Sequence, residues 1–145
     1  MRRTKPLLAV TAIVAVSVAA PAALGATGTP TVKLKKTNLG KILVSKRDTL
    51  FSFTRDRHGK DKCQSITGCT SIWKPLMTKH KPMAGPGVKA SLLGTIKLKN
   101  GKKQVTYNKH PLYIYTVAPR GTAYVDVKQF GGHWDALNAR GHPVN

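Results

Sequence analysis

A short phrase, in which a leucine precedes two aromatic residues separated by one position, occurs twice in this chain. It reads LFSFTRD at residues 50–56 and LYIYTVA at residues 112–118, so the copies lie 112 − 50 = 62 residues apart. Other features recur in the same order at nearly the same distance. They are Val32–Lys35 and Ile96–Lys99, Gly40 and Gly101, and Trp73 and Trp134. The pattern predicts an internal repeat, with units at about 32–76 and 96–144 joined by a Pro- and Gly-containing connector over 77–95.

Units of this kind typically cannot bury their apolar face alone, and they pack against each other. We therefore expect the large apolar side chains of both units to share one core. The expected core comprises the ring residues Phe51, Phe53, Tyr113, Tyr115, Trp73 and Trp134, with Leu50 and Leu112. The alternative is that these rings form an exposed platform that binds a ligand.

The local sequence patterns favour strands. Residues 32–35 and 96–99 alternate apolar and charged side chains with a period of two, which is typical of a strand with one buried face. Asn100–Gly101 then predicts a tight hairpin turn. Outside residues 7–20 no long stretch has helical periodicity. The predicted fold class is mostly β, with two β-meander or hairpin repeats packed into one small domain over 27–145.

The first 26 residues predict export. Three basic residues precede an uncharged run at 7–20, and small residues follow. This order is that of a secretory signal peptide, whose apolar core spans ~7 to 15 residues. We expect cleavage near residue 26 and no lipid, since no cysteine stands near the cleavage point. An uncleaved membrane anchor is the alternative.

Several motifs in order carry a family resemblance. They are residues 50–56, the pair Cys63 and Cys69 before 72–76, residues 84–88 with 92–96, and residues 104–108 with 111–113. Together they resemble a bacterial family of predicted lipoproteins and secreted repeats, marked by a Tyr-x-(Phe/Trp/Tyr)-x-x-Asp motif. The resemblance implies no particular reaction or ligand, because the family has no established biochemical function.

The motif is incomplete in each unit. Phe51 replaces the first tyrosine in one copy, and Ala118 replaces the aspartate in the other, whereas Asp56 and Tyr113 match it. A site that used the acids of both units could not operate here. We therefore expect Asp56 to be a turn or cap residue that accepts backbone N–H bonds. A ligand-binding or catalytic role is the alternative.

Cys63 and Cys69 are the only cysteines. In an oxidising, exported compartment a disulfide is the expected state of such a pair. Closing a loop of about seven residues stabilises a fold by roughly 2 to 2.5 kcal/mol. A redox-active pair is the alternative, although such pairs more often have a Cys-x-x-Cys spacing.

Met77, His80 and Met83 form the one weak metal candidate, because thioether and imidazole groups can bind Cu(I). They lie in the connector beside a proline, and methionine commonly fills gaps. The remaining histidines have no zinc-ligand spacing. We therefore expect neither a metal nor another cofactor.

Charge provides the main functional signal. The chain has 25 Lys and Arg against 5 Asp and no Glu, and removal of residues 1–26 leaves 22 − 5 = +17. The lack of Glu and of Gly-x-Ser-x-Gly argues against a hydrolase. We expect a non-enzymatic module that binds anionic surface polymers or lipid headgroups, without reading nucleic-acid sequence and without an identifiable small-molecule substrate. A small redox or copper-handling protein is the alternative, and charge that serves solubility alone is the simplest explanation.

Overall fold

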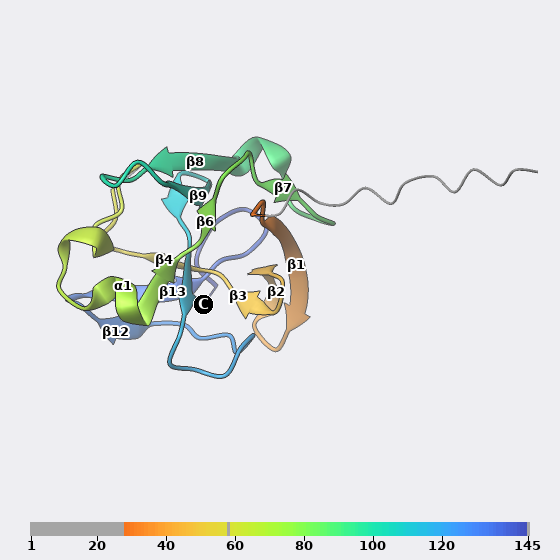
Figure 1. Cartoon of the computed structure of the whole chain (residues 1–145). Coiled ribbons are helices and arrows are strands. Elements are labelled where there is room, and N and C mark those ends of the chain that lie inside the picture. Colours follow the sequence, from red (N-terminus) through yellow and green to blue (C-terminus); the bar gives the residue numbers. More distant parts are fainter. Residues whose placement is uncertain (1–27, 58, 145) are drawn as a thin grey trace, which may run out of the picture.

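The computed structural model describes residues 28–57 and 59–144, so the predicted signal peptide lies outside the described residues. Strands dominate the fold, as predicted (Figure 1). The strands are β1 (Thr31–Thr37), β2 (Gly40–Ser45), β3 (Asp48–Thr49), β4 (Phe51–Phe53), β5 (Trp73–Pro75), β6 (Met77–Thr78), β7 (Met83–Ala84), β8 (Leu93–Lys97), β9 (Lys103–Tyr107), β10 (His110–Pro111), β11 (Tyr113–Tyr115), β12 (Val127–Gln129) and β13 (Gly132–Ala136). Within the described ranges, helix is confined to the short turns η1 (Cys63–Ser65), α1 (Cys69–Ile72) and η2 (Ala90–Leu92).

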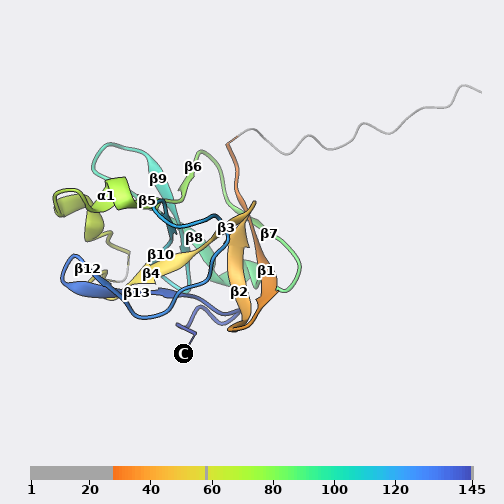
Figure 2. The same ribbon diagram turned by 90° about the horizontal axis from the view of Figure 1, so that it is seen from below.

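The described strands form three sheets. One has the order β3-β2-β1-β7, the second has the order β10-β9-β6 with β8 also paired to β9, and the third has the order β12-β13-β4-β11-β5. Figure 2 shows β1 and β2 on one side of the molecule and β12 and β13 on the other. The predicted Asn100–Gly101 turn joins β8 to β9, where Gly101 has a φ of 78°. A positive φ of this kind favours glycine.

The halves of the chain exchange strands with each other. Trp73 in β5 pairs with Tyr115 in β11, and Trp134 in β13 pairs with Phe53 in β4. A second pair of equivalent contacts between the halves follows further along the chain. Met77 pairs with Gln104, and Asn138 pairs with Ile42. Strands from both halves are therefore needed to complete the five-stranded sheet β12-β13-β4-β11-β5.

The register of the outer hairpins differs from the predicted alignment. Val32 lies opposite Ser45 in the β1–β2 hairpin, and Leu93 lies opposite Tyr107 in the β8–β9 hairpin. Because 45 + 62 = 107, the counterpart of Val32 is Leu93 rather than Ile96, three residues earlier than we aligned it. The predicted connector accordingly contains β6, β7, η2 and the start of β8.

Both faces of the inner strands are buried, and they contribute to two hydrophobic clusters. Ile42 and Val44 belong to an aromatic cluster that also contains the disulfide, whereas Leu43 belongs to an aliphatic cluster. Side chains alternate between the faces of a strand, so β2 supplies both clusters. Leu50 and Leu112 lie in the aliphatic cluster and the tryptophans in the aromatic one. The expectation of one shared core is therefore wrong in this detail.

Four rings of the aromatic cluster form a continuous stack in the order Phe53, Trp134, Trp73 and Tyr115. Successive ring centroids are 3.9, 4.1 and 4.1 Å apart, and the planes are within 16° of parallel. The first three of these rings are at most 2% exposed. Gln129 accepts both indole N–H bonds. Its side-chain oxygen accepts from Trp73, and its backbone carbonyl oxygen accepts from Trp134. The rings therefore form the interior of the fold.

Candidate anion-binding site

A groove of about 840 Å³ lies between the loop that follows β4 and the turn that follows β8. Figure 1 shows these segments next to each other at one end of the molecule. The lining residues are Thr54, Arg55, Arg57, Gly59, Lys60, Asp61, Lys62, Gln64, Ser65, Ile96, Lys97, Leu98 and Lys99. Six of them are basic and one is acidic, so the lining has a net charge of 6 − 1 = +5. A concentration of one sign of charge in a concave surface attracts counterions.

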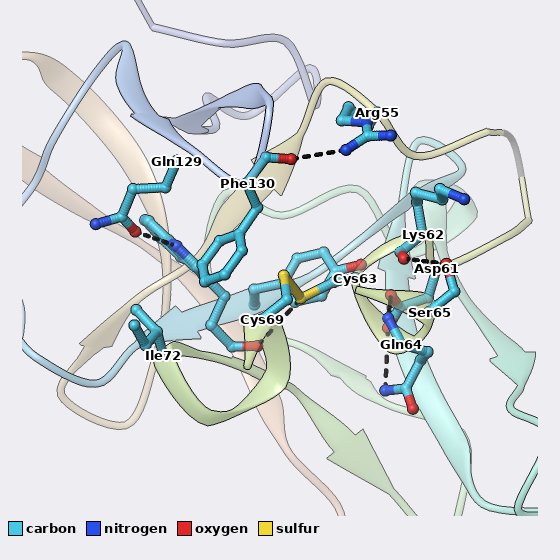
Figure 3. Close-up of a disulfide and its surroundings, with 12 residues drawn as sticks. Arg55, Asp61, Lys62, Cys63, Gln64, Ser65, Cys69, Ile72, Gln129 and Phe130 are labelled. Carbon is cyan, nitrogen blue, oxygen red and sulfur yellow. Dashed lines mark hydrogen bonds between the residues drawn. A yellow bond between two sulfur atoms is a disulfide. The ribbon is translucent and has the colours of Figure 1, made fainter. Parts of the chain in front are cut away.

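Local hydrogen bonds hold the loop wall of the groove. The Asp61 carboxylate accepts the backbone N–H of Gln64 at 3.0 Å, and the Ser65 hydroxyl donates to the carbonyl of Lys62 at 2.9 Å. These contacts surround the short turn η1 (Figure 3). Asp61 is thus used to shape the loop, because its oxygens accept bonds from the residue three positions later.

The Cys63–Cys69 disulfide fixes the end of this wall. The two Cα atoms are 5.4 Å apart, and both cysteines are fully buried beside Trp73. Figure 3 shows the disulfide between η1 and α1. The predicted disulfide is therefore present. Its burial argues against the redox alternative, because reactive cysteines are accessible.

Replacing both Cys63 and Cys69 with alanine is expected to lower the free energy of unfolding by about 2 kcal/mol, because the seven-residue loop regains its freedom in the unfolded chain. Urea denaturation of the variant and of the wild-type protein measures this change. Wild-type protein unfolded with a thiol reductant should show the same loss. A loss below about 0.5 kcal/mol would contradict the stabilising role.

Arg55 is held at one side of the groove. Its guanidinium donates to the Phe130 carbonyl oxygen at 2.8 Å, a contact drawn in Figure 3. The remaining N–H groups of Arg55 stay available, since a guanidinium has five donors. Arg55 thus gives the groove one oriented donor group.

Asp56 lies directly behind the loop wall, between two residues that line the groove. Its Oδ1 accepts the backbone N–H of Lys62 at 2.8 Å, and its Oδ2 accepts the Tyr113 hydroxyl at 2.9 Å. The aspartate of one unit is thus bonded to the tyrosine of the other. The exchanged strands thus join an acid to a phenol and not one acid to another.

Burial raises the pKa of Asp56 to about 7, although the bonds from Lys62 and Tyr113 act in the opposite direction. The negative charge of Asp61 adds to the increase. Burial also raises the pKa of Tyr113, so its phenol keeps its proton. A carboxyl group with this pKa changes its charge near neutral pH.

The corresponding place in the other half is closed. Phe51 and Ala118 lie there, and the remaining space is only about 10 Å³. Arg120 forms a two-pronged ion pair with Asp48, at 2.6 and 2.8 Å, across this position. Both members of the tyrosine–aspartate pair are therefore absent at this position.

The predicted metal candidates receive no support from the geometry. Met77 is half-buried in β6, His80 is exposed, and Met83 in β7 is 49% exposed. Among the described residues, no group of three or more His, Cys, Asp or Glu side chains could hold a metal ion. The copper site therefore stays a prediction. None of the described helices is both long and apolar enough to cross a membrane.

The sequence analysis did not identify the groove. A signal was present, since Arg55, Arg57, Lys60 and Lys62 fall within eight residues. The other groove lysines, Lys97 and Lys99, come from a distant stretch of chain, and their proximity depends on the fold. Comparison with protein-family models, curated proteins and solved structures gives no match for this chain.

Proposed function

We propose that this chain is an exported, non-enzymatic module that binds anionic polymers of the cell surface in its basic groove. The observation that carries the proposal is the convergence of six basic side chains with one carboxylate around a single cavity of about 840 Å³. Evenly distributed lysines would suffice for solubility alone. A concave cluster instead raises the local concentration of anions.

The lining favours a polymer that is held through its charged groups. None of the described residues lining the groove is aromatic, and the stacked rings lie in the interior. Proteins that hold single-stranded nucleic acids combine a basic groove with exposed rings on which the bases stack. Four of the six basic residues are lysines, which attract anions as point charges. Polymers with a phosphate or another anion in each repeating unit fit these properties.

Export is supported by two independent features. The sequence pattern of residues 1–26 is that of a signal peptide, and a buried disulfide is stable in oxidising compartments. A partner outside the cell would then be an anionic wall polymer or an acidic headgroup. We infer the same envelope location that the family resemblance suggests.

A paired lysine replacement tests whether the groove, rather than total charge, binds the polymer. The variant Lys97→Gln with Lys99→Gln removes two groove charges. The variant Lys33→Gln with Lys35→Gln removes two exposed charges from β1, outside the groove lining. Both carry the same net charge. The probe is fluorescently labelled inorganic polyphosphate, with its dissociation constant measured at several salt concentrations.

The groove variant should bind polyphosphate about 10- to 30-fold more weakly, at roughly 1 kcal/mol for each lysine near an anionic surface. The slope of the logarithm of its binding constant against the logarithm of salt concentration should also become shallower, by an amount that corresponds to about two phosphate contacts. The β1 variant should lose no more than about threefold, through long-range charge alone. Equal losses in both variants would show that binding follows net charge and not the groove.

A further inference from the structure

We propose that Asp56 and Tyr113 form a proton-controlled switch behind the groove, so that the groove binds anions more tightly when Asp56 gains a proton. This inference rests on the proposed function of the groove. It extends that function to regulation by the acidity of the surroundings.

The geometry couples Asp56 to the groove through its two oxygens. Oδ1 accepts the N–H of Lys62, whose side chain lines the groove, and Oδ2 accepts the hydroxyl of Tyr113 in β11. Asp56, near the start of the loop that follows β4, is therefore tied to Lys62, six positions later. Any change in its charge occurs immediately behind the wall that faces the ligand.

Ionisable groups from three parts of the described chain surround Asp56. Tyr113 faces it from β11, and Asp61 and Lys62 face it from the turn before η1. Arg55 and Arg57 are its chain neighbours, and both line the groove. The negative charge of Asp61 also helps to raise the pKa of Tyr113, whose hydroxyl donates to Asp56.

Protonation of Asp56 removes a negative charge and keeps the contacts. One carboxyl oxygen can take up the proton while the other continues to accept from Lys62. The phenol of Tyr113 can then change from donor to acceptor, since a hydroxyl group does both. The pKa of Asp56, raised by burial to about 7, places this change near neutral pH. The positive potential of the groove consequently increases as the pH falls from 8.5 to 5.5.

The test is a comparison of wild-type protein with Asp56→Asn, using labelled polyphosphate at constant low ionic strength. At pH 8.5 the variant should bind about three- to tenfold more tightly, since it lacks a buried negative charge close to the ligand. At pH 5.5 the two proteins should bind equally. Histidines also titrate in this range. Their contribution cancels in the ratio because both proteins contain them.

Asp48→Asn is the matched control. It removes one carboxylate that lies outside the groove lining, where the bond from Arg120 holds the pKa of Asp48 below its usual value. Its affinity ratio to wild type should therefore be the same at pH 5.5 and 8.5. This separates the charge of Asp56 from a general increase in net charge.

The outcomes separate the switch from the function on which it rests. If wild-type protein binds no polyphosphate at any pH, the proposed function fails. If it binds but the Asp56→Asn ratio is constant with pH, the groove is upheld and the switch is overturned. Should Asp56→Asn not fold, the carboxyl carbon of Asp56 in wild-type protein can be titrated by NMR. A midpoint near 7 supports the switch, and one below 5 overturns it.

Discussion

Replacement of Trp134 by alanine is expected to lower the free energy of unfolding by about 4 kcal/mol, within the range of ~3 to 5 kcal/mol for deletion of a buried large ring. Trp134 is fully buried and lies between Phe53 and Trp73 in the ring stack. It also contacts the edge of the Tyr113 ring. Its removal would leave a cavity at the point where the strands of both halves meet.

Urea denaturation followed by circular dichroism measures this loss. A small domain has a stability of ~5 to 15 kcal/mol, so the variant would be close to unfolding at 37 °C. Trp134→Phe should lose much less, because a ring remains in the stack. Trp73→Ala should match Trp134→Ala, since Trp73 occupies the adjacent position in the stack. A loss under about 1.5 kcal/mol for both alanine variants would show that the stack is not central to stability.

The second large effect is on the pH dependence of stability. The protein should become less stable as the pH rises from 4 to 8, because the folded state raises the pKa of Asp56 from 3.8 to about 7, chiefly by burial. A carboxyl with a raised pKa contributes stability that is complete below 3.8 and lost as the pH rises through about 7. At ~1.4 kcal/mol for each unit of pKa difference, the loss between pH 4 and 8 is on the order of 4 kcal/mol.

Urea denaturation at pH 4.5, 6, 7 and 8 tests this expectation. Asp56→Asn should remove most of the decline, because an amide does not ionise. The pKa of Asp48 is lowered by its bond to Arg120, so its stabilising contribution is lost only as the pH falls below about 3.8. Asp48→Asn should therefore leave the decline between pH 4.5 and 8 intact. A wild-type stability that is flat over this range would contradict the buried state of Asp56.

The sequence predicted the elements well where the signal was local. The alternation at residues 32–35 predicted β1, and Asn100–Gly101 predicted the turn of the β8–β9 hairpin. The ring residues are buried or half-buried, as their pattern suggested. These features depend on the immediate neighbours of each residue, which is why a pattern in one stretch of chain suffices.

The features that sequence patterns missed depend on contacts between distant segments. The strand pairings place Leu93, not Ile96, at the position in the β8–β9 hairpin that Val32 holds in the β1–β2 hairpin, because register is set by pairing with the next strand. The internal repeat itself stays a prediction. The groove joins Arg57 to Lys97, which are 97 − 57 = 40 residues apart. The partner of Asp56 was missed because strand exchange was not considered. Membership of the resembled family stays a prediction.

The ion pair between Arg120 and Asp48 has a consequence for how this protein would act on a polymer. It occupies the place that corresponds to Asp56 and Tyr113, and the groove with six basic side chains occurs once among the described residues. The other lysine-lined pocket, at Lys79, Lys102 and Lys103, is smaller, at about 510 Å³. A molecule that binds through the larger groove alone is monovalent. A monovalent protein can coat a strand and mask its charge, but it cannot bridge two strands into a network. Cross-linking would require self-association of the chains.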